Sequence, residues 1–436
     1  MTEMDPKRIH EAVAAQGGLW TGLFDTLRER TRDVEGVTRP GWSEADQAGA
    51  TLLSEQAAKL GLEVTQDEMG QVFMTLPGTD RSAPRVLAGS HLDSVPRGGN
   101  FDGYAGAVAG LSALAALKSM GVSPRADLTA IATRGEESVW YGIAYIGSRF
   151  AVGDLPWPEL EALRQVESGK PLTAHLTELG HDVAAVRARA EQGAAGAGVT
   201  AANTKAYLEL HIEQGPVLET MGIPLAIPTA IRGNWRYPAA RCLGRYGHSG
   251  AAPVDDRRDA LLATVELIHG LDRFWRERIA AGTPDTAFTV GRVHTDPGRD
   301  AMTIIPGECN FTLNMGGTTN EFMEAADALR AELAGSIAEE RKVTFEFGER
   351  KGSVPVVLDE GVRTLLLNAA QGQGIDIHEM ATVGHDAQVF SRAGIPAAMI
   401  LVRNQHGSHN PHEAMELDDF ARGVEVLTRV MVELGE

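Results

Sequence analysis

Short apolar runs alternate with segments of helical periodicity over the first third of the chain. Ser43 to Leu60 has the spacing of a helix and opens on a serine followed three residues later by an aspartate, which resembles a capping box. Val86 to Ala88 and Leu128 to Ala132 are apolar runs that indicate strands, and Ala105 to Met120 between them predicts a buried helix of small residues. This alternation predicts an α/β sheet with helices on both faces and ligand sites at the carboxyl ends of its strands.

The pattern changes along the remainder of the chain. Leu155 to Ala202 is a helical insertion rich in glycine and alanine, and the apolar strand Ala206 to Leu210 then ends at His211. A β-rich segment with two helices follows, and helix–strand alternation resumes after Pro355. We therefore expect a catalytic domain in two parts, 1–222 and 351–436, with an α+β domain inserted at 223–350.

Composition narrows the class of protein. A chain of 436 residues with 43% hydrophobic residues is long enough for two or three globular domains. No run approaches about 20 apolar residues and the polar stretch Met1 to His10 lacks a signal-peptide core, so we expect a cytoplasmic protein without a membrane partner. Cys242 and Cys309 have no cysteine neighbour in sequence, which argues against a disulfide framework or thiolate zinc cluster. The formal charge of -19 argues against nucleic acid as a partner.

Histidine and carboxylate side chains gather in segments at predicted strand ends and in loops. The segments are 90–93 (SHLD), 100–103 (NFDG), 135–138 (GEES), 210–214 (LHIEQ) and 407–411 (GSHNP). Imidazole with carboxylate suits Zn²⁺, with Mn²⁺, Co²⁺ or Ni²⁺ as alternatives, and a carboxylate shared by two ions is typical of dinuclear hydrolases. Each segment alone has an ordinary explanation, such as a hydrogen-bonded surface pair or a solvated turn. Their order and their placement at strand ends favour a metal site.

The order of these segments resembles the hydantoinase/carbamoylase amidases, relatives of the zinc aminoacylases and dimetal exopeptidases. The resemblance covers nearly the whole chain, and its strongest stretches are GSHLDSVPRGGNFDGYAG (89–106), ELHIEQGPVLE (209–219), GHSGAAP (247–253) and SHNPHE (408–413). It implies an α/β, dimetal-exopeptidase-like catalytic domain, with a central mixed sheet flanked by helices. It also implies that the inserted α+β domain is a lid that forms a homodimer and closes to assemble the site.

The resemblance assigns roles to the residues of these motifs. It implies ligands for two divalent metal ions, with His91 and His211 on one ion, Glu137 and His409 on the other, and Asp102 bridging them. Asp93 would steady His91 or its tautomer. Glu136 would be the general base that takes a proton from the attacking water and passes it to the leaving nitrogen. His248 matches a position that steadies the tetrahedral oxyanion across a subunit boundary, although without the resemblance it would be a histidine of a surface turn.

Three further positions concern the substrate. Gln214 matches a substrate-contacting position, and its amide suits a ureido or amide group. Thr303 replaces the asparagine that commonly precedes the Ile-Ile-Pro segment. His385 falls at a position often near the substrate, and a residue at a helix start explains it equally well.

The position expected to bind a substrate carboxylate departs from the family pattern. Many members carry an arginine that binds the α-carboxylate, and Gly316 takes its place here. Arg403 is the best candidate replacement because it follows a predicted strand and precedes His409 closely; the others are Arg232, Arg236 and Arg299. Either another arginine replaces the missing one or the substrate is not a standard N-carbamoyl amino acid.

The sequence thus predicts a metal-dependent amidohydrolase that cleaves a linear carbon–nitrogen bond of a small ureido or amide compound. An N-carbamoyl amino acid is the leading substrate. The missing arginine keeps an N-acyl amino-acid deacylase and an allantoate-type amidohydrolase open as alternatives. A catalytically silent binding protein is a third alternative, although the implied ligands and Glu136 are all present.

Overall fold

The computed structural model describes residues 5–283 and 285–436, and the chain divides into two compact units. The first unit comprises Met1–Thr229, Leu358–Met380 and His385–Glu436, and the second comprises Ala230–Val357 and Ala381–Gly384. The second unit is therefore inserted into the sequence of the first. None of the helices in the described ranges is long and apolar enough to cross a membrane.

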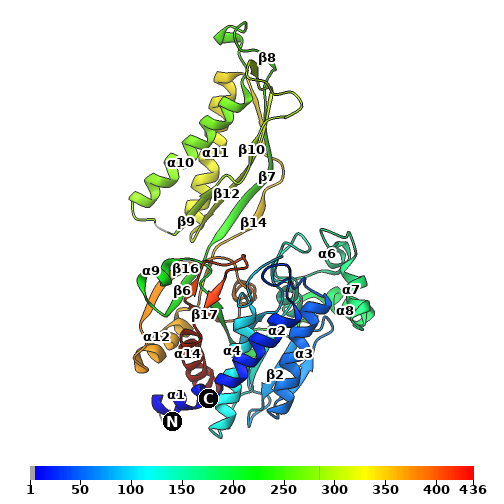
Figure 1. The fold of residues 1–436 in the computed structure, drawn as a ribbon, viewed down its shortest axis with the longest axis vertical. Coiled ribbons are helices and arrows are strands. Elements are labelled where there is room, and N and C mark those ends of the chain that lie inside the picture. The colour runs from blue at the N-terminus through cyan, green and yellow to red at the C-terminus, as the bar shows by residue number, and fades with distance from the viewer. Residues whose placement is uncertain (1–4, 284) are drawn as a thin grey trace. The chain divides into compact units, whose positions relative to one another are not determined.

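A mixed sheet forms the centre of the first unit (Figure 1). Its strands are β1 (Glu63–Gln66), β2 (Val72–Leu76), β3 (Arg85–His91), β4 (Leu128–Thr133), β5 (Thr204–Ile212), β6 (Leu225–Ile231), β15 (Val356–Val357), β16 (Ile377–Thr382) and β17 (Ala397–Val402). They lie in the order β1-β2-β4-β3-β5-β17-β6-β15, and β16 also pairs with β6. β3 pairs parallel with β4 and β5, and β5 pairs parallel with β17, whereas the outer pairs β1–β2, β2–β4, β6–β17 and β6–β15 are antiparallel.

Helices pack on this sheet. The principal ones are α1 (Pro6–Ala14), α2 (Gly17–Arg30), α3 (Glu44–Lys59), α4 (Tyr104–Ser119), α12 (Glu360–Gly372), α13 (Ala387–Arg392) and α14 (Leu417–Gly435). Among them, α3 and α4 are the two that the apolar pattern of the first third predicts. α4 is buried along most of its length because its small residues allow close approach to the sheet. Ser43 caps α3 by accepting a hydrogen bond from the Asp46 backbone N–H, while the Asp46 carboxylate accepts from the Trp42 N–H instead of completing a capping box.

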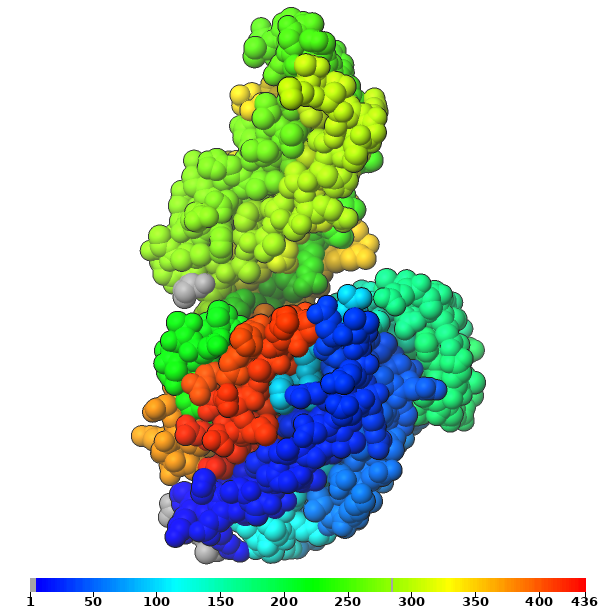
Figure 2. Space-filling model, in the orientation of Figure 1, coloured from blue at the N-terminus to red at the C-terminus, as the bar shows by residue number. Residues whose placement is uncertain are grey.

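The N-terminal helices lie against the C-terminal helix. Figure 2 shows the N-terminal segment, in blue, beside the C-terminal segment, in red, on the surface of the first unit. The rings of Trp20 and Phe24 meet Phe420 of α14 edge to face, with centroids 5.5 and 5.3 Å apart. The buried face of α2 consists of Trp20, Leu23, Phe24 and Leu27, which have the i, i+3, i+4, i+7 spacing of a helix. That spacing was present in the sequence but was not used to predict α2.

The helical insertion packs as a separate apolar layer of the first unit. It contains α5 (Ile146–Ala151), α6 (Trp157–Ala162), α7 (Leu172–Glu178), α8 (Val183–Gln192) and the 3-10 turn η1 (Gly193–Gly196), and α9 (Val217–Met221) follows β5. Its helices bury Trp140, Phe150 and Trp157 against Trp42, which precedes α3. The two short strands β18 (Asn404–Gln405) and β19 (Ala414–Met415) pair near the C-terminus.

The second unit is an antiparallel sheet covered on one face by two helices (Figure 1). Its strands are β7 (Gly233–Leu243), β9 (Thr286–Thr289), β10 (Val293–His294), β12 (Glu308–Gly317), β13 (Thr344–Glu346) and β14 (Lys351–Ser353), and its helices are α10 (Ala260–Ala280) and α11 (Asn320–Arg341). A separate two-stranded sheet joins β8 (Gly247–His248) to β11 (Ile304–Ile305), and the 3-10 turn η2 (Val254–Asp256) follows β8. The inward side chains of β7 and β12 alternate along each strand and form the core with α10 and α11.

Two buried cysteines face each other in this core, although they are distant in sequence. Cys242 of β7 and Cys309 of β12 are paired in register, fully buried and not joined by a disulfide. Burial raises the pKa of Cys242 to about 12 and also raises the pKa of Cys309. Both thiols are therefore protonated and shielded at neutral pH.

We predict that neither thiol reacts with a disulfide-exchange reagent in the native protein at pH 8, because the thiolate is the reactive form. After unfolding in guanidinium chloride, both should react, and Cys242→Ser and Cys309→Ser should each remove one reactive group. Absorbance of the released chromophore measures the reaction. Rapid labelling of both thiols before unfolding would contradict the burial of this pair.

Candidate two-metal active site

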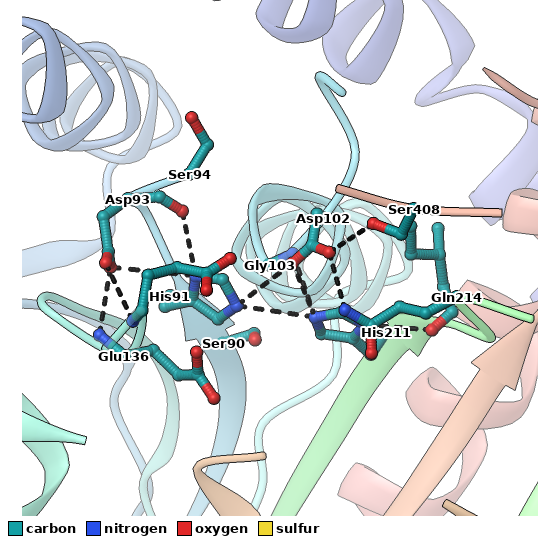
Figure 3. Close-up of polar contacts among 12 residues, drawn as sticks. Ser90, His91, Asp93, Ser94, Asp102, Gly103, Glu136, His211, Gln214 and Ser408 are labelled. Atoms are coloured by element: carbon teal, nitrogen blue, oxygen red, sulfur yellow. Dashed lines mark hydrogen bonds and ion pairs between the residues drawn. The ribbon is translucent and has the colours of Figure 1, made fainter. Parts of the chain in front are cut away.

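The strand ends of the central sheet place the predicted ligands next to one another. His91 is the last residue of β3, and His211 lies one residue before the end of β5. Glu136 and Glu137 follow β4, the strand that pairs parallel with β3. Asp102 lies just before α4, so these side chains meet at the carboxyl edge of the parallel strands (Figure 3).

The first cluster consists of His91, Asp102 and His211, all of which are buried. Asp102 Oδ1 lies 3.4 Å from His91 Nε2 and 3.3 Å from His211 Nε2. The two imidazole nitrogens are 3.4 Å apart. Two neutral imidazoles and one carboxylate form a donor set that suits a divalent transition metal.

The second cluster shares Asp102 and adds Glu137 and His409. Asp102 Oδ2 lies 3.5 Å from His409 Nε2, and Glu137 Oε1 lies 3.4 Å from the same nitrogen. The His409 side chain is 51% exposed, whereas Asp102 and Glu137 are buried. The two oxygens of Asp102 thus face different clusters, which is the arrangement that a bridging carboxylate requires.

Backbone carbonyls fix which nitrogen of each buried histidine faces the cluster. His91 Nδ1 lies 3.0 Å from the carbonyl oxygen of Asp93, and His211 Nδ1 lies 2.9 Å from that of Ile212. A carbonyl can only accept, so each ring donates from Nδ1, and a neutral ring carries its lone pair on Nε2. The Gly103 N–H donates to His211 Nε2 over 3.0 Å in the metal-free chain, and Glu137 Oε1 is buried without a hydrogen-bond partner among the described residues. These acceptor atoms fit the binding of metal ions.

The turn that holds Glu136 is fixed by the carboxylate of Asp93. Asp93 Oδ1 accepts hydrogen bonds from the N–H groups of Gly135 and Glu136, and Oδ2 accepts from the N–H of Glu137 (Figure 3). The carboxylate lies 3.7 Å from His91 Nδ1, whereas the Asp93 carbonyl is closer. Asp93 therefore steadies the imidazole mainly through its backbone, and its side chain orients the turn after β4.

Burial changes the proton affinity of the acids in this turn. In the metal-free chain, burial raises the pKa of Glu136 well above its ordinary value. His91 lowers the pKa of Glu136, while the carboxylate of Glu137 raises it further. The proton affinity of this carboxyl is thus raised toward the range that a general base needs.

The remaining predicted residues of the first unit occupy different surroundings. Gln214 Nε2 donates to Asp102 Oδ2 over 2.7 Å, so its amide lies directly at the clusters (Figure 3). His385 precedes α13 and is buried, with its ring centroid 4.4 Å from that of His211. The guanidinium of Arg403 forms an ion pair with Asp419 at 2.7 Å. Arg403 thus already has a carboxylate partner within the chain.

The positions His248, Thr303 and Gly316 belong to the second unit. His248 of β8 is paired in register with Ile304 of β11, and the Ser249 N–H donates to the Thr303 carbonyl over 2.8 Å. His248 thus lies on the strand that pairs with β11, and Thr303 lies in the turn just before β11. His248 is exposed, and its Nδ1 accepts from the Gly250 N–H. Gly316 lies on β12 opposite Asn234 of β7.

Two residues that contact Asp102 have no role in the sequence-based prediction. Ser408 Oγ lies 2.5 Å from Asp102 Oδ2, and Glu413 accepts the backbone N–H of Asp102. Both residues lie in the SHNPHE motif, from which only His409 was given a role. The acidic residue at the end of that motif was the available signal.

Comparison with known proteins places this site in a family of hydrolases. The model of peptidase family M20/M25/M40 matches residues 87–433. The N-carbamoyl-L-amino acid amidohydrolase of Geobacillus stearothermophilus is 32% identical over 422 residues, covering 96% of this chain and 98% of that protein. The allantoate amidohydrolase of Bacillus subtilis is 29% identical over 406 residues, covering 92% of this chain and 93% of that protein.

Solved structures give the same assignment. The crystal structure of an amidase of the hydantoinase/carbamoylase family from Burkholderia multivorans has a TM-score of 0.83 and 26% identity, covering 99% of this chain and 98% of that one. The chain belongs to peptidase family M20/M25/M40. The predicted resemblance, the mixed sheet flanked by helices and the class of metal-dependent amidohydrolase are thereby confirmed. Members of this family are two-metal enzymes, and the two clusters supply candidate ligands here.

A glycine beside His91 offers a test of the first cluster. Gly103 has φ +65°, and a Cβ there would lie 2.3 Å from the His91 ring. We predict that Gly103→Ala weakens metal binding by roughly 10- to 100-fold, because the ring must move. Gly121→Ala is the matched control, since Gly121 has φ +69° with nothing within 4 Å of its added Cβ.

Metal affinity measured by competition with a chromophoric chelator separates the two variants. Both should lose about 1 kcal/mol of stability from the left-handed backbone. Only Gly103→Ala should lose metal affinity. Equal affinities in the two variants would show that His91 does not bind the ion.

Proposed function

We propose that this enzyme hydrolyses the carbamoyl carbon–nitrogen bond of a small N-carbamoyl amino acid. Five ligands would hold the metal centre: His91, Asp102, Glu137, His211 and His409. The observation that carries this proposal is Asp102, because each of its oxygens faces a different group of ligands at one strand edge. The relationship to carbamoyl-amino-acid amidohydrolases over nearly the whole chain supports the substrate class.

The chemistry follows from the surroundings of Glu136. Two divalent ions, when bound, supply Lewis-acid activation of the scissile carbonyl and of a water molecule. Glu136 takes a proton from the water as the water oxygen bonds to the carbonyl carbon; the carbon–nitrogen bond then breaks, and Glu136 delivers the proton to the leaving nitrogen. Asp93 keeps the Glu136 turn fixed during both transfers, because its carboxylate holds three successive backbone N–H groups.

Amide and imidazole groups at the site suit a ureido substrate. Gln214 lies against Asp102, and its Oε1 is buried without a hydrogen-bond partner among the described residues. That oxygen can accept from a ureido N–H group. We propose that Gln214 and His385 contact the substrate in the first unit. We further propose the roles that the family resemblance gives to two residues of the second unit: His248 stabilises the oxyanion and Thr303 contacts the substrate.

The candidate arginines differ in what already binds them. Arg403 is paired with Asp419, Arg232 is paired with Asp285, and Arg299 lies over the ring of Tyr246. These contacts reduce the suitability of all three for binding a substrate carboxylate.

Arg236 has a different position on the sheet of the second unit. It is exposed, and its Nε atom donates a long hydrogen bond of 3.4 Å to Asn314 Oδ1. Arg236 is paired with Asn314, and the adjacent pair two residues along is Asn234 with Gly316. Residues two apart on a strand share a face, so Arg236 faces the same side of the sheet as position 316. We propose that Arg236, in place of Arg403, grips the substrate carboxylate.

Further properties complete the proposal. We propose Zn²⁺ as the native ion because the donor sets combine imidazole with carboxylate, with Mn²⁺, Co²⁺ and Ni²⁺ as alternatives. We also propose a cytoplasmic homodimer that associates through the second unit. The exposed apolar side chains of Val254 and Met302 in that unit support the dimer.

Neutralising Glu136 tests the catalytic assignment. We predict that Glu136→Gln lowers kcat by roughly 100- to 10,000-fold while the variant still binds two metal ions per chain. Glu137→Gln is the contrasting variant and should lose metal, because it replaces a ligand of the second cluster. Steady-state kinetics with N-carbamoyl amino acids and elemental analysis measure these effects. Metal loss in Glu136→Gln would make Glu136 a ligand, and full activity of metal-free protein would refute the mechanism.

Neutralising Arg236 tests whether it binds the substrate carboxylate. We predict that Arg236→Met raises KM for N-carbamoyl amino acids by about 10- to 100-fold, because a charge-assisted hydrogen bond is lost. Arg241→Met is the control, since Arg241 is equally exposed on β7 but is paired with Glu346. A panel of carbamoyl, formyl and acetyl amino acids with allantoate identifies the substrate. No turnover of any of these carboxylates would refute the substrate class, and turnover of allantoate alone would favour the allantoate-type alternative.

A further inference from the structure

The carboxylate of Glu413 is buried inside the loop that carries Asp102. Its Oε1 accepts hydrogen bonds from the backbone N–H groups of Phe101 and Asp102, over 2.9 and 3.2 Å. Its Oε2 lies 2.6 Å from Ser408 Oγ. Glu413 is more than 300 positions away from that loop in sequence, yet it satisfies two of its backbone donors.

The loop before Asp102 is shaped to admit this carboxylate. A Cβ at Gly99 would lie 2.1 Å from the Glu413 Cδ atom, so residue 99 must lack a side chain. The buried guanidinium of Arg39 donates to the Leu92 carbonyl and to Asn100 Oδ1 in the same loop. Buried polar groups from two other segments of the chain therefore hold the loop.

Ser408 extends this contact to the second cluster. Its hydroxyl lies between Glu413 Oε2 and Asp102 Oδ2, at 2.6 and 2.5 Å. The next residue along the chain is His409, the half-exposed member of the second cluster. Glu413 and Ser408 thus join the loop of Asp102 to the loop of His409.

We infer that Glu413 is a positioning residue that fixes Asp102 and His409 relative to each other, so that the second metal site assembles from two loops as one unit. This inference rests on the proposed function, because it assumes that Asp102 and His409 bind metal. His91 and His211 belong to strands β3 and β5 and do not need this link. The affinity for the second ion should therefore depend on Glu413 more strongly than the affinity for the first ion.

Two substitutions of Glu413 distinguish a role of its hydrogen bonds from simple filling of space. In Glu413→Gln, the amide oxygen can still accept from Phe101 and Asp102, and the amide nitrogen can donate to Ser408 Oγ. The Ser408 hydroxyl is then free to donate to Asp102. In Glu413→Leu, a side chain of similar size fills the space, but the two N–H groups lose their acceptor and Ser408 keeps only its contact with Asp102. Glu413→Gln should therefore retain the hydrogen bonds that Glu413→Leu loses.

The experiment titrates metal-free protein with Zn²⁺ against a chromophoric chelator and resolves the affinities of the first and second ions. We expect Glu413→Leu to weaken the second ion at least tenfold and the first ion much less. Glu413→Gln should bind both ions within about threefold of the wild type. Glu416→Leu is the control for an apolar replacement, because Glu416 is an exposed residue of the same segment. Ser408→Ala breaks the same link with a smaller change of side chain and should also weaken binding of the second ion. It provides the test if Glu413→Leu does not fold.

Thermal unfolding of the metal-free variants reports any general loss of stability. An unchanged second-ion affinity in Glu413→Leu, or in Ser408→Ala where Glu413→Leu does not fold, would overturn the inference while leaving the proposed function intact. An equally weak second ion in Glu413→Gln would overturn the role of its hydrogen bonds. Wild-type protein that binds no Zn²⁺ would instead refute the proposed function, and this inference with it.

Discussion

The site depends on keeping several buried carboxylates close together around Asp102. Like charges in a poorly solvated region repel one another, and each carboxylate also loses hydration. The chain offsets this cost with fixed donors: backbone N–H groups bind Asp93 and Glu413, and Gln214 and Ser408 lie against Asp102. Most of the polar groups around the metal site can be understood as supports for these negative charges, which the bound cations would then neutralise.

This constraint explains why the motifs contain so many glycines. Gly99 makes room for the Glu413 carboxylate, and Gly103 makes room for the His91 imidazole. At these two positions a side chain would occupy the space of a functional group. The glycines in GGNFDG are therefore part of the site, although they carry no chemistry of their own.

Much of the first unit could be predicted because its signals are local. The apolar runs of β3 and β4 and the small-residue helix α4 are visible in short windows of sequence, and the ligand motifs adjoin them. Contacts between distant segments could not be predicted in this way. The facing pair of Cys242 and Cys309 depends on the register of two strands, and the contact of Glu413 with Phe101 depends on how two loops fold together. The partner of Arg403 depends on where α14 begins relative to β17.

The central position of β17 has a consequence for how the protein is made. This strand comes late in the sequence, yet it pairs between β5 and β6 in the middle of the sheet. During synthesis, the edge of β5 that pairs with β17 stays unpaired until almost the whole chain has left the ribosome. The second unit has been synthesised by then. The unpaired edge of β5 is exposed to mispairing during that interval. His409 emerges later still, so the proposed second metal site can form only at the last stage of biogenesis.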